Sequence, residues 1–262
     1  MEILIIGKDG LLGHDLACLV KESGYSVIGT DRNELDITNK DEVARFFQKH
    51  DPDVIINCAV ISPKACEKNF DLAFAVNVQG VFFFHKVRSK LIQFSSPAVF
   101  DNLTSLKNIQ YICNVEYGYR EGDAVDARSV YGKTKVAMEE FLRGSDCLIL
   151  RTSWIYTKKL PFGLANIEEF PLNEIGRPTY SRDIWNIIKI GISEKLAGIY
   201  HVCGPEIMSR YEQARIFNNK DVKQSYLEQD NIRPLSILKI QPFLKKYEIE
   251  LTKWPEAVKT NN

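Results

Sequence analysis

A glycine-rich turn directly after an apolar strand limits the fold of this chain more than any other feature. Residues 3–6 are all branched aliphatic, and the turn Gly7-Lys8-Asp9-Gly10-Leu11-Leu12-Gly13 follows at once, leading into a helical pattern. Glycines at this spacing permit a tight turn, close backbone approach to a pyrophosphate and close packing of helix on strand. The helix N-terminus beyond the turn offers unpaired N–H groups to phosphate. Gly7, Gly10 and Gly13 are therefore predicted to bind a dinucleotide; a glycine turn without a ligand is the alternative.

Short apolar runs alternate with amphipathic stretches along the chain. The expected strands are residues 3–6, 25–30, 53–57, 91–95, 147–152 and 198–202. The expected helices are residues 11–21, 40–49, 72–88, 130–142 and 182–192. Strands that are apolar throughout indicate burial on both faces, as in a parallel sheet covered by helices. The order predicts an α/β, Rossmann-type doubly wound sheet with right-handed crossovers.

The rhythm breaks near Tyr156, where Pro161, Pro171 and Pro178 lie close together. We expect a Rossmann domain over residues 1–155. Residues 156–262 are expected to form mainly a small C-terminal substrate-binding lobe, with segments that return to the Rossmann sheet.

Composition excludes several classes of protein. Lys and Arg total 34, and Asp and Glu also total 34, so bulk charge gives no support for a nucleic-acid partner. No apolar run reaches the length of a membrane span, and the N-terminus has no signal-peptide pattern, so we expect a cytoplasmic protein without a membrane partner. The six cysteines form no CxxC pair, and no metal site is expected. The sequence leaves a homodimer open.

The second expected strand ends at Asp31-Arg32. An acidic residue at this point typically accepts hydrogen bonds from the adenosine ribose, which favours NAD. Arg32, with Lys8 in the glycine turn, could instead hold a 2′-phosphate. The cofactor is therefore NADP or NAD, and a solvated loop pair is the alternative for these two side chains.

Tyr131 and Lys135 lie four residues apart in a predicted helix and so share one face. A tyrosine hydroxyl exchanges protons poorly at neutral pH because its ordinary pKa is about 10. A neighbouring ammonium favours the phenolate and is expected to bring the pKa nearer its working range. The pair follows a predicted strand that ends in Ser95-Ser96, and this position strengthens the prediction that the two side chains act together.

Together these residues resemble the extended short-chain dehydrogenase/reductase family, and within it the dTDP-4-dehydrorhamnose reductase (RmlD-like) branch. The resemblance covers most of the chain. It is carried by residues 52–59, 75–78, 99–101, 130–135, 150–154, 176–180 and 233–235.

The resemblance implies a role for each matching residue. Toward the cofactor, Gly10, Leu11 and Leu12 would face the pyrophosphate, Asp36 and Ile37 the adenine, and Ala59, Val60 and Ile61 the nicotinamide.

On the catalytic side, the resemblance implies that Ser96 hydrogen-bonds the substrate carbonyl. Tyr131 would protonate the alkoxide as hydride arrives, with Lys135 assisting, and both residues would also contact the cofactor. Trp154 matches a residue that contacts the sugar nucleotide, although a core aromatic is an equal alternative.

This chain departs from the branch after the catalytic hydroxyl. Pro97 and Ala98 replace an acidic and an aromatic residue, so any hydrogen bond made by that carboxylate is lost. Proline also restricts Ser96 to extended backbone angles. Residues 102–118 look longer than usual for the branch, and residues 156–175 look shorter.

The resemblance implies an NAD(P)H-dependent oxidoreductase that reduces a 4-keto-6-deoxysugar nucleotide, converting dTDP-4-dehydrorhamnose to dTDP-L-rhamnose. Two alternatives stay open. Pro97 and the shortened region motivate a nucleotide-loaded regulatory subunit like the β subunit of methionine adenosyltransferase. A sugar-nucleotide epimerase would share the Tyr131 and Lys135 pair but keep its NAD tightly bound.

Overall fold

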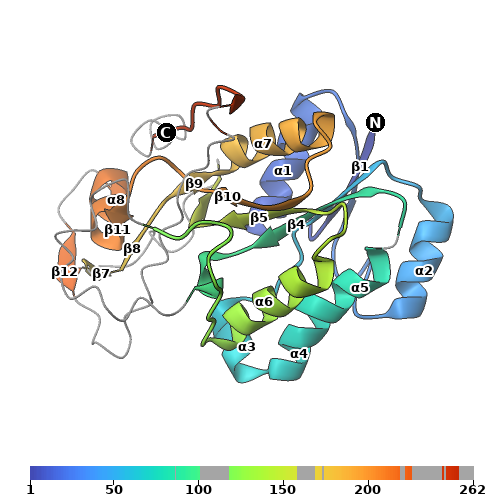
Figure 1. Cartoon of the computed structure of the whole chain (residues 1–262), viewed down its shortest axis with the longest axis horizontal. Helices are drawn as coiled ribbons and strands as arrows, with labels where there is room; N and C mark the ends of the chain where they lie inside the picture. Colours follow the sequence, from blue (N-terminus) through green and yellow to red (C-terminus); the bar gives the residue numbers. More distant parts are fainter. Residues whose placement is uncertain are drawn as a thin grey trace.

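Six parallel strands form the central sheet of the protein (Figure 1). The computed structural model describes residues 1–85, 87–100, 118–157, 169–172, 174–218, 222–225, 244 and 246–253. In the order β10-β5-β4-β3-β1-β2, the strands are Gly198–Val202, Leu148–Thr152, Lys90–Ser95, Val54–Asn57, Glu2–Ile6 and Ser26–Thr30. The prediction of a doubly wound parallel sheet is confirmed.

Strand β1 explains why these strands are apolar on both faces. Ile3 and Ile5 pack into the core on one side of the sheet, whereas Leu4 and Ile6 pack into the core on the other. All four are nearly inaccessible to solvent. An alternating polar pattern would leave one of these cores unfilled.

Helices cover both faces of the sheet (Figure 1). On one face lie α1 (Leu11–Glu22) and α7 (Ser181–Ser193), which pack against each other. On the other lie α2 (Lys40–Lys49), α3 (Pro63–Lys68), α4 (Phe70–Phe74), α5 (Gly80–Phe84) and α6 (Val130–Leu142). The sequence reading missed α3, although Ser62 caps it and Pro63 occupies its first turn.

The single helix expected over residues 72–88 is wrong. The chain instead forms α4, a π-helical turn η1 (Ala75–Gln79) and α5, which ends at Phe84. Within η1 the buried Asn77 accepts a hydrogen bond from the Ile61 N–H (2.9 Å) and donates one to Thr134 Oγ1 (3.0 Å). The wider turn directs this carboxamide between the segment after β3 and helix α6. Such π turns are frequent at functional sites.

A smaller lobe adjoins the carboxyl ends of the strands, at the left of Figure 1. It contains the strand pairs β6–β9, β7–β12 and β8–β11 and the helix α8. Strand β6 is Ile155–Tyr156 and pairs with β9 (Thr179–Tyr180), β7 is Glu169–Pro171 and pairs with β12 (Lys223–Ser225), and β8 is Ile175–Gly176 and pairs with β11 (Met208–Ser209). Helix α8 is Arg210–Asn218. The chain returns from this lobe to the main sheet through α7 and β10, while the proposed division at residue 155 stays a prediction.

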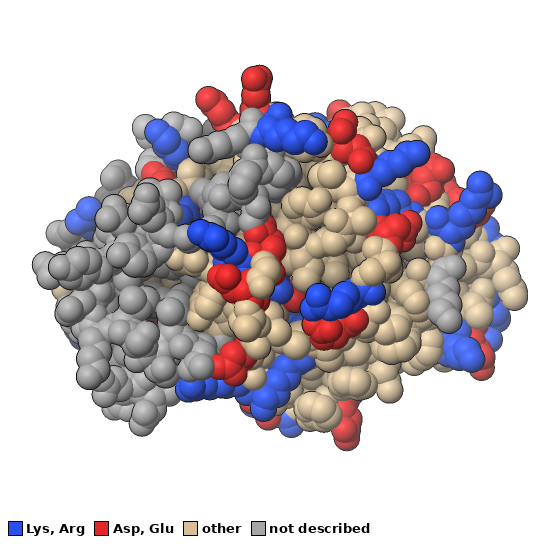
Figure 2. All heavy atoms as spheres, in the orientation of Figure 1, with Lys and Arg blue, Asp and Glu red and all other residues tan. Residues whose placement is uncertain are grey.

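Basic and acidic side chains are interspersed on the face drawn in Figure 2. Among helices in the described part of the chain, none is long and apolar enough to cross a membrane. The described cysteines, Cys18, Cys58, Cys66, Cys147 and Cys203, are free thiols.

Candidate functional site

The glycine turn brings the start of α1 against the end of β1. Gly7 has a φ of +82°, which glycine adopts without strain. A Cβ on Gly13 would lie 2.2 Å from the carbonyl oxygen of Gly7, so only glycine permits this contact. The Gly7 and Lys8 N–H groups donate to the Thr30 carbonyl at 2.8 and 3.0 Å. The N-terminus of α1 is thereby fixed at the point where the chain crosses from β2 to β3 on opposite sides of β1.

A cavity of about 220 Å³ lies at this point. Predicted site residues that line it are Gly10, Leu11, Leu12, Gly13, Ala59, Val60, Tyr131 and Lys135. The structure thus brings together the glycine turn and the tyrosine–lysine pair, which lie more than a hundred residues apart.

Six further cavity residues were missed by the sequence reading. They are Asn57, Cys58, Phe94, Ser95, Thr152 and Ile155. Most of them end or follow the neighbouring strands β3, β4 and β5. Ligands of open parallel sheets bind outside the carboxyl ends of the strands, so strand ends were the signal that could have found them.

Burial sets the protonation of the tyrosine–lysine pair. It raises the pKa of Tyr131 to about 12, against a smaller lowering by the hydrogen bond with the Ser96 side chain. The expected lowering of the Tyr131 pKa is therefore wrong in direction, because burial disfavours the charged phenolate. Tyr131 is neutral and carries a proton that it can donate.

Lys135 is almost fully buried beside this phenol. Its Nζ lies 5.6 Å from the centre of the Tyr131 ring and donates to the Phe94 carbonyl at 3.0 Å. Burial lowers the pKa of Lys135 to about 8, while Cys66 and Glu139 act in the opposite direction. The ammonium is thus present at neutral pH and titrates within the accessible range.

Pro97 leaves Ser96 in a usable position. Ser96 has extended angles (φ −149°, ψ 154°), as the sequence predicted, and Pro97 starts a short 3₁₀ turn, Pro97–Val99. The Ser96 hydroxyl accepts from the Ala98 N–H at 3.2 Å and hydrogen-bonds Tyr131. The proline thus leaves the Ser96 hydroxyl hydrogen-bonded to Tyr131, although Ser96 is not among the described residues that line the cavity.

Charged side chains surround the end of β2. Lys8 Nζ lies 3.9 Å from Asp31 Oδ2 and pairs closely with Glu34. Backbone N–H groups, chiefly that of Glu34, lower the pKa of Asp31, so its carboxylate is ionised. Arg32 is exposed, and its Nε lies 3.7 Å from Asp36 Oδ2. Three carboxylates, of Asp31, Glu34 and Asp36, and two cations, Lys8 and Arg32, thus meet where the sequence places the adenosine ribose.

Three other predicted residues make contacts outside the cavity lining. The Asp36 carboxylate accepts from the Thr38 N–H at 2.9 Å and from its hydroxyl. The Ile37 side chain is buried in the core, and the Ile61 N–H is held by Asn77 as described above.

Trp154 lies between the sheet and the smaller lobe. A Cβ on Gly176 would meet its indole at 3.0 Å, and the guanidinium carbon of Arg210 lies 3.9 Å from the ring centre. The ring is half-buried and packs against the core of the smaller lobe. The 233–235 segment, Asp101, and most of the two regions of unusual length lie outside the described residues.

Comparison with known proteins gives one consistent grouping. A family model described as the RmlD substrate binding domain matches residues 1–261. The chain is similar to a dTDP-4-dehydrorhamnose reductase of Aggregatibacter actinomycetemcomitans, with 34% identity over 250 residues that cover 86% of this chain and 81% of the relative.

Two solved structures agree with this grouping. The dTDP-4-dehydrorhamnose reductase of Bacillus anthracis str. Ames, in complex with NADP, superimposes with a TM-score of 0.84 and 26% identity over 99% of this chain and 97% of that one. A dTDP-4-dehydrorhamnose reductase of Clostridium acetobutylicum ATCC 824 superimposes with a TM-score of 0.82 and 29% identity over 100% of this chain and 98% of that one.

The Gly13 contact predicts a stability defect. We expect Gly13→Ala to lower the free energy of unfolding by about 1–3 kcal/mol, because the new Cβ must displace backbone. Gly122→Ala is the control, since nothing lies within 4 Å of its Cβ. Denaturant unfolding of both variants tests this, and equal stability of Gly13→Ala and the unaltered protein would contradict it.

Proposed function

Because the chain belongs to the family of the RmlD substrate binding domain, we propose that it is an NAD(P)H-dependent reductase that converts dTDP-4-dehydrorhamnose to dTDP-L-rhamnose. The observation that carries this proposal is the single cavity in which the α1 N-terminus meets Tyr131 and Lys135. The names of the similar reductases support the substrate.

The residues present fit a nicotinamide dinucleotide. Gly10 lines the cavity without a side chain, and Gly13 lets α1 start close to the end of β1, since a Cβ at Gly13 would strike Gly7. The first N–H groups of α1, at Leu11 and Leu12, suit a pyrophosphate. Asp31 and Arg32 would meet the adenosine ribose, with Asp36 and the backbone of Ile37 beyond them. Ala59, Val60 and Ile61 would border the nicotinamide.

The chain's own groups supply the proton chemistry. The bound cofactor provides the hydride that reaches the carbonyl carbon. The Ser96 hydroxyl holds the carbonyl oxygen beside Tyr131, whose phenol donates its proton to that oxygen. The positive charge of Lys135 stabilises the phenolate that remains. Trp154 would contact the sugar nucleotide from the side of the smaller lobe.

Tyr131→Phe removes the proton donor without changing the shape of the cavity. We expect kcat for NAD(P)H oxidation with dTDP-4-dehydrorhamnose to fall by roughly 10²–10⁴-fold, and Ser96→Ala to lower it as well. Cofactor affinity, measured by fluorescence titration, serves as the control and is expected to stay within a few-fold.

Several outcomes would overturn the proposal. Full turnover by Tyr131→Phe would remove the assigned role. A protein that turns over no keto-sugar nucleotide and purifies with a synthetase would be a regulatory subunit. One that retains NAD through purification would be an epimerase.

The pH dependence follows from the protonation of Lys135. Below about 8 the lysine of the free protein carries its charge, and above that pH the charge is lost, so kcat/KM is expected to fall as pH rises through about 8. Tyr131, with its pKa raised to about 12, stays protonated over this range. A profile of kcat/KM against pH checks this, and a flat alkaline range would contradict it.

The charges at the end of β2 predict how cofactor choice responds to mutation. Asp31→Asn removes an anion from the ribose region, so KM for NADPH should fall relative to KM for NADH. Arg32→Gln should shift the ratio in the opposite direction. Each shift is expected to be about fivefold, for an interaction of about 1 kcal/mol at an exposed site. Paired KM measurements would contradict the assignment if both variants moved the ratio the same way.

A further inference from the structure

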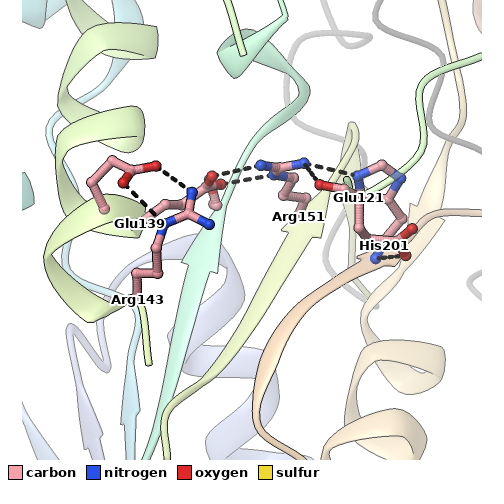
Figure 3. Close-up of polar contacts among 7 residues, drawn as sticks. Glu121, Glu139, Arg143, Arg151 and His201 are labelled. Atoms are coloured by element: carbon pink, nitrogen blue, oxygen red, sulfur yellow. Dashed lines mark hydrogen bonds and ion pairs between the residues drawn. The ribbon is translucent and has the colours of Figure 1, made fainter. Parts of the chain in front are cut away.

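A buried ion pair joins the catalytic helix to the sheet beneath it. Arg151 on β5 donates to Glu139 on α6 through two parallel contacts, Nε to Oε1 at 2.8 Å and Nη2 to Oε2 at 2.6 Å (Figure 3). The two side chains are only 2% and 3% exposed. The reaction described above uses neither of them.

Glu139 also reaches the strand that carries the catalytic serine. The Ser95 hydroxyl, at the end of β4, donates to Glu139 Oε1. Ser95 directly precedes Ser96, and Glu139 lies one helical turn beyond Lys135 on the same face of α6. One carboxylate therefore connects the segment holding Ser96 with the helix holding Tyr131 and Lys135.

Arg151 extends the connection to the edge strand β10 and to the segment that follows Ser96. Its Nη1 lies 3.2 Å from His201 Nε2 on β10 and 3.3 Å from the Glu121 carbonyl. Its guanidinium carbon lies 4.8 Å from the centre of the Phe100 ring, just after the turn that follows Ser96. Figure 3 shows Arg151 in the middle of this chain of contacts.

The Ser95–Glu139 bond separates two cavities. Ser95 lines the cavity of the candidate site, whereas Glu139 and Arg151 line a neighbouring cavity of about 250 Å³. A buried ion pair is a weak source of stability, since well-packed apolar residues often replace one without loss. Its position between the catalytic segments points to a role in geometry.

We propose that Glu139 is a positioning residue that fixes Ser96, Tyr131 and Lys135 in their positions relative to one another and keeps the Lys135 side chain charged. The proposal rests on the proposed reductase function. Its carboxylate sits one turn from Lys135 and favours the ammonium. Among the described residues, the other titratable groups around Lys135 are Tyr131 on its own helix, Cys66 on α3 and Cys58 in the same cavity lining, while the charged group that faces Glu139 is Arg151.

Two single variants separate the effect of the Glu139 charge from the effect of its hydrogen bond with Ser95. Glu139→Gln removes the charge but keeps an oxygen that can accept from Ser95, so the alkaline limb of the kcat/KM profile should move to lower pH. Ser95→Ala removes the tether but keeps the charge, so kcat should fall while the limb stays in place. We expect kcat losses of roughly tenfold or more from misplacement of the reacting groups.

Glu140→Gln is the matched control. Glu140 is the next residue on α6, is about half exposed and pairs with Arg143 at the surface. The same substitution there should leave kcat and the alkaline limb unchanged. Wild-type kcat and an unmoved limb in both Glu139→Gln and Ser95→Ala would overturn the proposal.

A further variant keeps the test valid if Glu139→Gln fails to fold with Arg151 unpaired. Glu139→Gln combined with Arg151→Met removes both buried charges. A pair with a purely structural role would leave this folded protein with wild-type kcat and pH profile, whereas the proposal expects both to change.

A direct titration separates this proposal from the reductase function. Carbon NMR of lysine-labelled protein, with Lys135 assigned from Lys135→Met, gives the pKa of Lys135 without substrate. A lower Lys135 pKa in the Glu139→Gln protein supports the proposal even if the tested sugar is not turned over, and an unchanged pKa overturns the charge role. Failure of the unaltered protein to oxidise NAD(P)H would count against the reductase function alone.

Discussion

The contact between Gly13 and the carbonyl of Gly7 governs how the rest of the site is assembled. Since no side chain separates them, α1 starts at Leu11 directly over the end of β1. The same turn is anchored to Thr30 at the end of β2. The helix N-terminus therefore opens onto the crossing point of the sheet, and the ends of β3, β4 and β5 supply the remaining cavity walls.

Desolvation gives the two central groups of the cavity opposite shifts. It raises the pKa of Tyr131 and lowers that of Lys135, because each loses water around its charged form. The result is a neutral phenol beside an ammonium whose pKa, about 8, lies close to neutral pH. This pairing suits protonation of a reduced ketone. The Tyr131 phenol carries its proton before the reaction begins, and the positive charge of Lys135 that stabilises the resulting phenolate is already present.

The sequence predicted most of the sheet because burial on both faces leaves a strong local pattern. Strand β10 and helices α2 and α6 have the bounds expected from periodicity alone. The π turn could not be predicted in this way, because Asn77 is fixed by Ile61 and Thr134, which are distant in sequence. Glu139 was missed for the same reason: its partners Ser95 and Arg151 lie on two strands, and a carboxylate in a helix normally indicates a solvated face.

The π turn also constrains the length of the chain. A π turn holds one residue more than the α-helical turn it replaces. Deleting a residue from Ala75–Gln79 would restore a regular α-helical turn and leave α5 in its present phase, because the π turn accommodates the extra residue within a single turn. Val81 and Phe84 would stay in the core beneath the sheet, but the wider turn that directs Asn77 toward Ile61 and Thr134 would be lost. Homologous chains that keep this carboxamide are therefore expected to tolerate insertions and deletions in the flanking loops but not within these five residues.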